Sequence, residues 1–371
     1  MQADFHYYAT YCAAYLAGYS HEESMDICYS AQFVDQCSRT LLAKIKAPVH
    51  AATTQLQLEL MDARTDMTGL QDITRIWASF HFLPRDLYAQ KEKRTRRYMN
   101  KYRLICGPNG KLAEDTVELA KGKPLQCVGI AMHVLADTWA HSYFAGTPSL
   151  VINNTNDEFY EILSGDEGEF ERKVRFRHSA TAPDNPEESI YSNSVFHRSE
   201  NTIMNLGHGR AGHLPDYSYA KYRYVPAWGD YAVLIKDNPH DYRKAFAQMI
   251  LAMKYIRGDI GSFMTDTYAF DVIEPYEDRI DKILRKRQLI ASDDWKRFGE
   301  ELSGCVIDDY DIEKYQGEYM MSDDKDATFV GRFIAGADAH KNMVTGKIID
   351  SQNPLAGIVL PDKLRSKGGI S

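Results

Sequence analysis

Apolar residues recur along much of this chain at the three- and four-residue spacing of amphipathic helices. After Asn238-Pro239, a suitable helix start, apolar side chains follow at 245, 249, 250, 253 and 256, and Gly258 is a suitable stop. Ser20 and Glu23 form a capping box that predicts a helix reaching about residue 45. Further helices are expected over residues 4–17, 125–145, 275–287, 292–302 and 327–341.

Two stretches depart from this helical pattern. Residues 147–201 are rich in Asp, Glu, Asn, Ser and Pro, and we expect a long polar insertion there with one amphipathic helix near 157–163. Residues 53–61 alternate only weakly, as a short strand or an exposed segment would. The pattern predicts an all-α fold, a multi-helix bundle over residues 1–300 with this insertion, and an irregular C-terminal extension over 301–371 that packs on the bundle.

The stretch 130–146, IAMHVLADTWAHSYFAG, carries the clearest chemical signal in the chain. His133, Asp137 and His141 stand four residues apart, so a helix would align them on one face. Polar groups among apolar neighbours are costly unless a partner satisfies them, and imidazole and carboxylate are usual ligands of divalent metals. The alternative is a pair of core histidines oriented by Asp137 without any metal.

Other segments supply further candidate ligands. His6 lies near the chain start with Asp4 beside it, Asp35 falls within the predicted second helix, and His81 lies in the apolar run IWASFHFLP. A glycine- and tyrosine-rich stretch, 203–228, is loop-like. It contributes His208, His213 and Asp216, with Arg210 between the two histidines as a candidate contact for a substrate anion.

Composition and charge limit the classes of function. The net charge of −8 argues against broad, sequence-independent nucleic-acid binding. The basic run at residues 91–98 is a solvated face or a rim that attracts phosphate. None of the six cysteines forms a CxxC pair, and neither a secretory signal nor an apolar run long enough to span a membrane occurs. We expect a cytoplasmic protein with free thiols.

The order of these residues resembles a known superfamily. An early helix with a histidine, an aspartate on the next helix, an isolated histidine and then an HxxxD helix are similar to the zinc-dependent phospholipase C and single-strand nuclease superfamily. The whole chain also looks like an uncharacterised bacterial family with the pattern DFHYY…AQFVD…SFHFLP…MHVLADTWAHSYFAG…GHGRAGHLPDYSY. The superfamily resemblance implies an all-α fold and a three-zinc cluster that hydrolyses phosphate esters.

Carried over by residue, the resemblance implies a first metal held by Asp35, His81, His133 and Asp137. Asp137 would bridge to a second metal beside His6, and His141 with the His208–His213 region would hold a third. This chain departs from the superfamily in opening Met1-Gln2-Ala3, where the superfamily uses an N-terminal tryptophan whose amine and carbonyl bind zinc; Asp4 is the candidate substitute. The spacing of Asp137 and His141 and the loop-borne third site also differ from the superfamily pattern.

We therefore predict a metal-dependent hydrolase that acts on a small phosphorylated substrate. Two or three divalent ions are expected, with zinc favoured and manganese, iron or nickel compatible with the same ligands. Asp35 or Asp216, where it is not committed to metal, would serve as the catalytic base. One alternative is an HD-type phosphohydrolase using His240-Asp241. Another is a non-enzymatic protein with a structural metal and a binding pocket. A di-iron oxidase is disfavoured because the chain lacks Glu-x-x-His.

Overall fold

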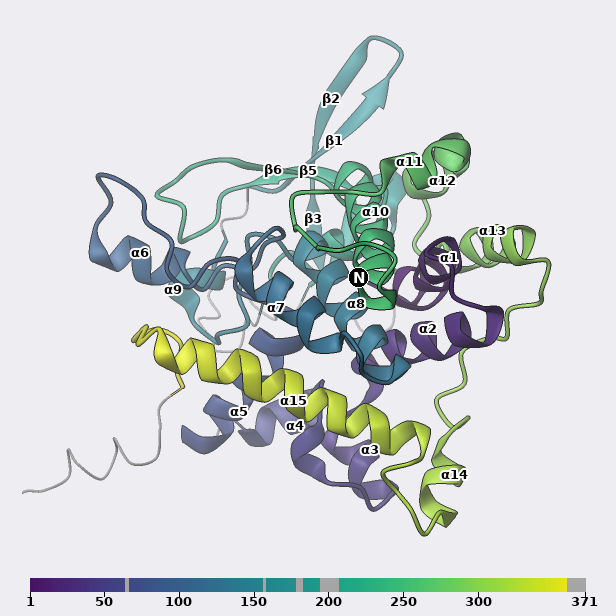
Figure 1. Cartoon of the computed structure of the whole chain (residues 1–371). Helices are drawn as coiled ribbons and strands as arrows, with labels where there is room; N and C mark the ends of the chain where they lie inside the picture. Colours follow the sequence, from purple (N-terminus) through teal and green to yellow (C-terminus); the bar gives the residue numbers. More distant parts are fainter. Residues whose placement is uncertain (64–66, 156–157, 178–182, 194–206, 359–371) are drawn as a thin grey trace, which may run out of the picture.

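The computed structural model describes residues 1–63, 67–155, 158–177, 183–193 and 207–358. Most of them are helical (Figure 1). The helices are α1 (Thr10–Leu16), α2 (His21–Gln36), α3 (Arg39–Lys44), α4 (Gln57–Ala63), α5 (Met67–Phe80), α6 (Arg96–Tyr102), α7 (Lys111–Ala120), α8 (Leu125–Ala140), α9 (Leu150–Asn153), α10 (Asn238–Arg257), α11 (Phe270–Ile273), α12 (Glu277–Arg285), α13 (Ser292–Ser303), α14 (Gln316–Met321) and α15 (Phe329–Asp350).

Helix α8 is the centre of the fold. It packs against α2, α5, α7, α10 and α15, and almost all of its residues are buried. The approach of α2 is close because Gly129 has no side chain: a Cβ atom there would lie 2.4 Å from the Ile27 carbonyl oxygen and 2.4 Å from the Ser30 Cβ atom. The glycine therefore sets the distance between the two helices that carry most candidate ligands.

The segment before α1 and the end of α2 bring further candidates to this centre. Residues Asp4–Ala9 form a π-helical segment that continues into α1 and is entirely buried. The Ser20–Glu23 capping box is present at the start of α2. The single helix expected to reach residue 45 is divided, because the Ser38 side chain accepts a hydrogen bond from the Leu41 backbone and caps α3 separately.

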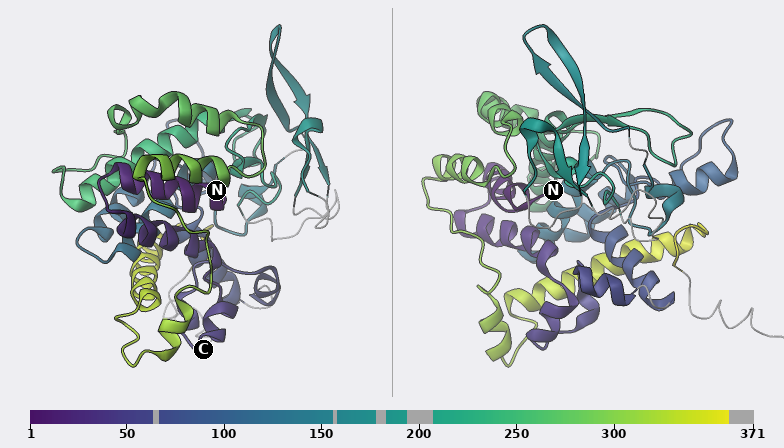
Figure 2. Two further views of the ribbon diagram at one scale, coloured as in Figure 1. Left: turned by 90° about the vertical axis from the view of Figure 1, so that its right-hand side faces the viewer. Right: turned by 180° about the vertical axis from the view of Figure 1, so that it is seen from behind.

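The prediction of an all-α fold is wrong. The chain contains a four-stranded antiparallel sheet with the order β2-β1-β5-β6 and a two-stranded parallel sheet of β3 and β4. Strands β1 and β2 extend as a hairpin away from the helical body (Figures 1 and 2). The strands are β1 (Tyr160–Gly165), β2 (Gly168–Lys173), β3 (Arg175–Arg177), β4 (Ile190–Ser192), β5 (Lys221–Tyr224) and β6 (Leu234–Asp237).

The sheet belongs to a second, aromatic core. Along β5 burial alternates, so that Tyr222 and Tyr224 point inward, and the Tyr224 ring stacks on Phe144 and Phe159. This period of two is the pattern of a strand with one buried face. The helix expected near residues 157–163 is therefore wrong, since its described part enters β1.

The C-terminal extension is more regular than expected. It contains α15, a 22-residue helix whose apolar face joins the same hydrophobic core as α8. The helix expected over residues 327–341 is present and runs further, to Asp350, while the division of the chain at residue 300 stays a prediction. None of the helices in the described ranges combines the length and apolar character needed to cross a bilayer.

Candidate metal centre

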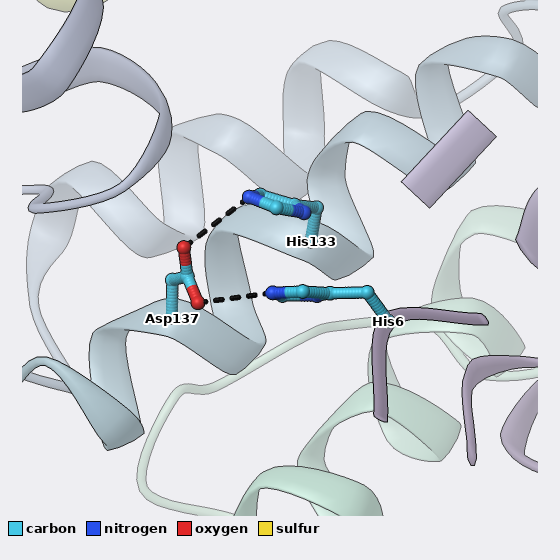
Figure 3. Close-up of side chains that lie close together, drawn as sticks. All are labelled: His6, His133 and Asp137. Atoms are coloured by element: carbon cyan, nitrogen blue, oxygen red, sulfur yellow. Dashed lines mark hydrogen bonds and ion pairs between the residues drawn. The ribbon is translucent and has the colours of Figure 1, made fainter. Parts of the chain in front are cut away.

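Three side chains converge where α8 passes the π-helical segment (Figure 3). The Nε2 atom of His133 lies 3.2 Å from Asp137 Oδ2, and the Nε2 atom of His6 lies 3.1 Å from Asp137 Oδ1. The two imidazole rings stack with their centroids 3.8 Å apart. All three residues are buried. We call His6, His133 and Asp137 the first ligand group.

A second ligand group shares His133 and adds Asp35 and His81. Asp35 lies one residue before the end of α2, and its Oδ1 atom is 3.8 Å from His81 Nδ1 and 3.9 Å from His133 Nε2. His81 Nδ1 is also 3.3 Å from Asp137 Oδ2. Asp137 therefore joins the two groups, because its Oδ1 atom faces His6 while its Oδ2 atom faces His133 and His81.

A third ligand group consists of His141, His208 and Asp216. Asp216 Oδ1 lies 3.1 Å from His141 Nε2, and Asp216 Oδ2 lies 3.5 Å from His208 Nε2. His141 caps the C-terminus of α8 instead of lying within the helix. Because the Met1 amine lies 2.8 Å from Asp137 Oδ1 and 3.1 Å from Asp216 Oδ1, the third group is continuous with the first.

Backbone carbonyl groups fix which nitrogen faces the centre for four of the ligand-group histidines, His81, His133, His141 and His208. The Nδ1 atom of His133 donates to the Ala31 carbonyl at 2.9 Å, and the Nε2 atom of His81 donates to the Thr53 carbonyl at 3.0 Å. A neutral imidazole that donates through one nitrogen presents a lone pair on the other. The lone pairs of His133 and His81 are thereby directed at Asp137 and Asp35, as metal ligation requires.

The histidines of the third group follow the same rule. His141 Nδ1 donates to the His81 carbonyl at 2.7 Å, and His208 Nδ1 donates to the Gly212 carbonyl at 2.7 Å. Gly212 has φ +59° and packs so tightly against the Ser192 carbonyl that a Cβ atom would not fit. The turn that holds His208 therefore requires glycine.

Spacing within the groups suits a divalent ion. Four ligands at about 2.1 Å from a tetrahedral ion lie about 3.4 Å from one another. The ion pairs within the three groups span 3.1–3.9 Å, and in each group the three ligand atoms lie within 4.8 Å of one another. The side chains can thus converge on an ion without a rearrangement of the backbone.

The carboxylates of this centre interact with the protonated Met1 amine. Burial would lower the pKa of the Met1 amine, but Asp137 and Asp216 outweigh burial and raise that pKa to about 11. Burial also opposes ionisation of both carboxyl groups. The neighbouring histidines and the amine nevertheless hold the pKa of Asp137 and of Asp216 well below the usual range. A protonated amine therefore balances two buried anions.

Most of the imidazoles are neutral for a simple reason. Burial lowers the pKa of His6, His133 and His208 to about 4 each. Burial also raises the pKa of Asp35, whereas hydrogen bonding to Asp137 and the charge of Asp35 raise the pKa of His81 against burial. His6, His133 and His208 are therefore in the neutral form that binds a metal, whereas His81 and Asp35 hold protons more readily and would release them on ligation.

Several predicted site residues lie elsewhere. The Asp4 carboxylate accepts hydrogen bonds from the backbone of Phe5 and Ala291, so it belongs to none of the three groups. His213 contacts Asp216 through Nδ1 at 3.3 Å, but its side chain is 60% exposed and it too lies outside the groups. Arg210 is partly buried, and its proposed contact with substrate stays a prediction.

The residues of the HD-type alternative are also apart from the centre. His240 is exposed in the first turn of α10, and the Asp241 carboxylate pairs with Lys236 at 2.5 Å. Neither belongs to the ligand groups found in the described part of the chain. The geometry therefore gives this dipeptide no role in the candidate metal centre.

Comparison with known proteins adds a family but no activity. A family of unknown function, DUF6765, matches residues 1–348. The chain belongs to the DUF6765 family. No curated protein and no solved structure matches it. Membership of DUF6765 agrees with the expectation of an uncharacterised family, while the resemblance to the phospholipase C and nuclease superfamily stays a prediction.

Proposed function

We propose that this protein is a metal-dependent hydrolase of phosphate esters that uses two or three divalent ions. The observation that carries the proposal is the position of the Asp137 carboxylate, whose Oδ1 atom faces His6 and whose Oδ2 atom faces His133 and His81. Shared ligands place two ions within a few ångströms of each other, which is the spacing that clamps a phosphoryl group. A single structural ion would not need three groups of ligands.

In this proposal the residues divide by position. Asp35, His81, His133 and Asp137 hold the first ion, and Asp137 with His6 holds the second. His141, His208 and Asp216 hold the third. Zinc is favoured because the donors are imidazole nitrogen and carboxylate oxygen, although manganese, iron and nickel accept the same ligands.

The chemistry depends on what the chain can add to the ions. When bound, the ions would supply Lewis acidity and a nucleophile at neutral pH. Where it is not committed to the first ion, Asp35 is the best placed base, since burial raises its pKa and yet its side chain remains 27% exposed. It can therefore hold a proton on the side from which solvent and substrate approach. Asp216 is the second candidate for this role, and Arg210 is a candidate partner for the substrate phosphate.

The test is a hydrolysis assay on chain that has been depleted of metal and reloaded with zinc, manganese, iron or nickel. Phosphomonoester and phosphodiester substrates are compared. We expect turnover with at least one metal, and we expect Asp35→Asn to reduce kcat about 100-fold or more if Asp35 is the base. Asp26→Asn is the matched control, since Asp26 lies on the same helix but hydrogen-bonds Tyr315.

Two results would contradict the proposal. Bound metal with no hydrolysis of any phosphate ester would favour the structural-metal alternative, in which ions only stabilise the helices. Equal activity of the Asp35→Asn and Asp26→Asn variants would remove Asp35 from the reaction.

A further inference from the structure

Two cavities lie apart from the ligand groups. One, of about 420 Å³, is between α7, α8 and α15, and a larger one is beside the loop after α8. The larger, about 620 Å³, is bordered by the turn Cys106–Lys111 and by residues that immediately follow His141. Its size is that of pockets for small organic ligands. None of its lining residues belongs to a candidate ligand group.

Aromatic rings form one side of this cavity. The Tyr143 ring stacks on Trp228 with ring centroids 6.4 Å apart and an interplanar angle of 25°. The Tyr102 ring also contacts Trp228, with their centroids 6.0 Å apart. The Trp228 indole nitrogen donates to the Tyr143 carbonyl at 2.9 Å, which fixes the relative position of the pair. Tyr143 is only partly buried, so a ligand in the cavity can reach it.

The backbone of Tyr143 is strained. Its φ is +80°, a value that is a clear outlier for a bulky side chain and that glycine would adopt freely. The conformation is held from both sides, because the Tyr143 amide donates to the Cys106 carbonyl at 2.9 Å while its own carbonyl accepts from Trp228. Strain kept at an aromatic residue on a cavity wall indicates that the position of this ring matters.

The cavity also has cations that no carboxylate neutralises within the described part of the chain. Arg85 and Lys244 line it, and the Lys244 ammonium lies 5.8 Å from the ring centroids of both Trp139 and Tyr268. The Lys91 ammonium lies 4.7 Å from the ring centroid of Tyr102, another lining residue. Of the two acids that line the cavity, Asp241 pairs with the buried Lys236. Asp86 is exposed, accepts a hydrogen bond from the Tyr88 backbone amide and keeps its negative charge.

We propose that this cavity binds a phosphorylated aromatic compound of mononucleotide size. The planar ring would lie against Tyr143 and Trp228, and the phosphate would face Arg85 and Lys244. Aromatic faces favour stacking with any flat π-system, and unpaired guanidinium and ammonium groups favour phosphate. The site is separate from the candidate metal centre and does not depend on the proposed hydrolysis.

The test measures binding of AMP by calorimetry on the full chain, as purified and after removal of metal by a chelator. Ribose 5-phosphate lacks the ring, and adenosine lacks the phosphate. We expect AMP to bind at least 10-fold more tightly than either, with or without metal.

Variants separate the two halves of the site. Arg85→Gln changes an exposed residue and should weaken AMP about 10-fold without changing the affinity for adenosine. Tyr143→Gly removes the ring while allowing φ +80°, and should weaken AMP by a similar factor. Lys282→Gln, an exposed cation on α12, is the control and should bind AMP as the wild type does. Equal affinity for the three compounds, no binding of AMP, loss of binding with the metal, or AMP affinity unchanged in both variants would each overturn the proposal.

Discussion

The contact between α2 and α8 at Gly129 offers a direct test of how the centre is positioned. Changing Gly129 to alanine places a methyl group 2.4 Å from the Ile27 carbonyl oxygen and 2.4 Å from the Ser30 Cβ atom. Both atoms are close to the α2 backbone, so the helices must separate. This separation would draw the Ala31 carbonyl and Asp35 away from His133.

The magnitude follows from two opposing effects. Overpacking of a core typically destabilises by about 1–3 kcal/mol, and contacts this short belong to the upper part of that range. Alanine gains about 1 kcal/mol over glycine within a helix. We expect Gly129→Ala to lower the free energy of unfolding by about 1–2 kcal/mol net. For cooperative unfolding of 371 residues this lowers the melting temperature by roughly 1–3 °C.

Gly346→Ala on α15 is the matched control, because no atom lies within 4 Å of the Cβ it would gain. This variant should be stabilised by up to about 1 kcal/mol. The assay is thermal and urea unfolding of both variants with and without added metal, together with metal content. If Gly129→Ala were as stable as Gly346→Ala and kept its metal, the close approach at Gly129 would not position the ligand groups.

Three further predictions concern buried polar groups. Elemental analysis should show that Asp137→Asn loses at least one bound ion per chain, because Asp137 faces two ligand groups, whereas the control Asp26→Asn keeps all of its ions. An Asp137→Asn variant that retains every ion would show that Asp137 is not a ligand. Lys236→Met leaves Asp241 unpaired and should lower the free energy of unfolding in urea by about 3 kcal/mol. Adding Asp241→Asn to this variant should restore part of the loss, and a Lys236→Met variant as stable as the wild type would refute the prediction. Burial lowers the pKa of His340 to about 3 against 6.5 for an ordinary histidine, so the unfolded chain binds more protons between these values and stability falls as pH drops below 6.5. In metal-depleted protein, His340→Gln should lack this contribution to the loss of stability at low pH, which amounts to up to about 1.4 kcal/mol of unfolding free energy per pH unit. Equal profiles of unfolding free energy against pH for the wild type and the variant would contradict this.

Local sequence signals were sufficient to find most of the candidate site. The four-residue spacing of His133 and Asp137 requires only the geometry of one helix, and His141 follows as the residue that caps its C-terminus. His81 stood out because it interrupts an apolar run. Which of these residues share an ion depends on long-range packing, and only the structure supplies that.

Long-range packing also explains where the structure departs from the sequence expectations. Asp4 was expected to be a ligand because it neighbours His6; its carboxylate hydrogen-bonds the distant Ala291 amide, and its ligation of a metal stays a prediction. The carbonyl groups of Ala31 and Thr53 orient two histidines, and nothing in their sequence marks them. The short strands β1 and β2 lack a continuous apolar face, so their periodicity could not reveal the sheet. Ser38, by contrast, was a readable signal for the break between α2 and α3.

The central claim is that buried histidines and aspartates from separate segments share several divalent ions. The most direct measurement is the number of metal ions per chain, by elemental analysis of protein purified without an affinity tag. Two or three ions per chain, falling in the Asp137→Asn variant, are predicted. A folded wild-type chain that holds no ion, even after incubation with zinc or manganese, would contradict the account.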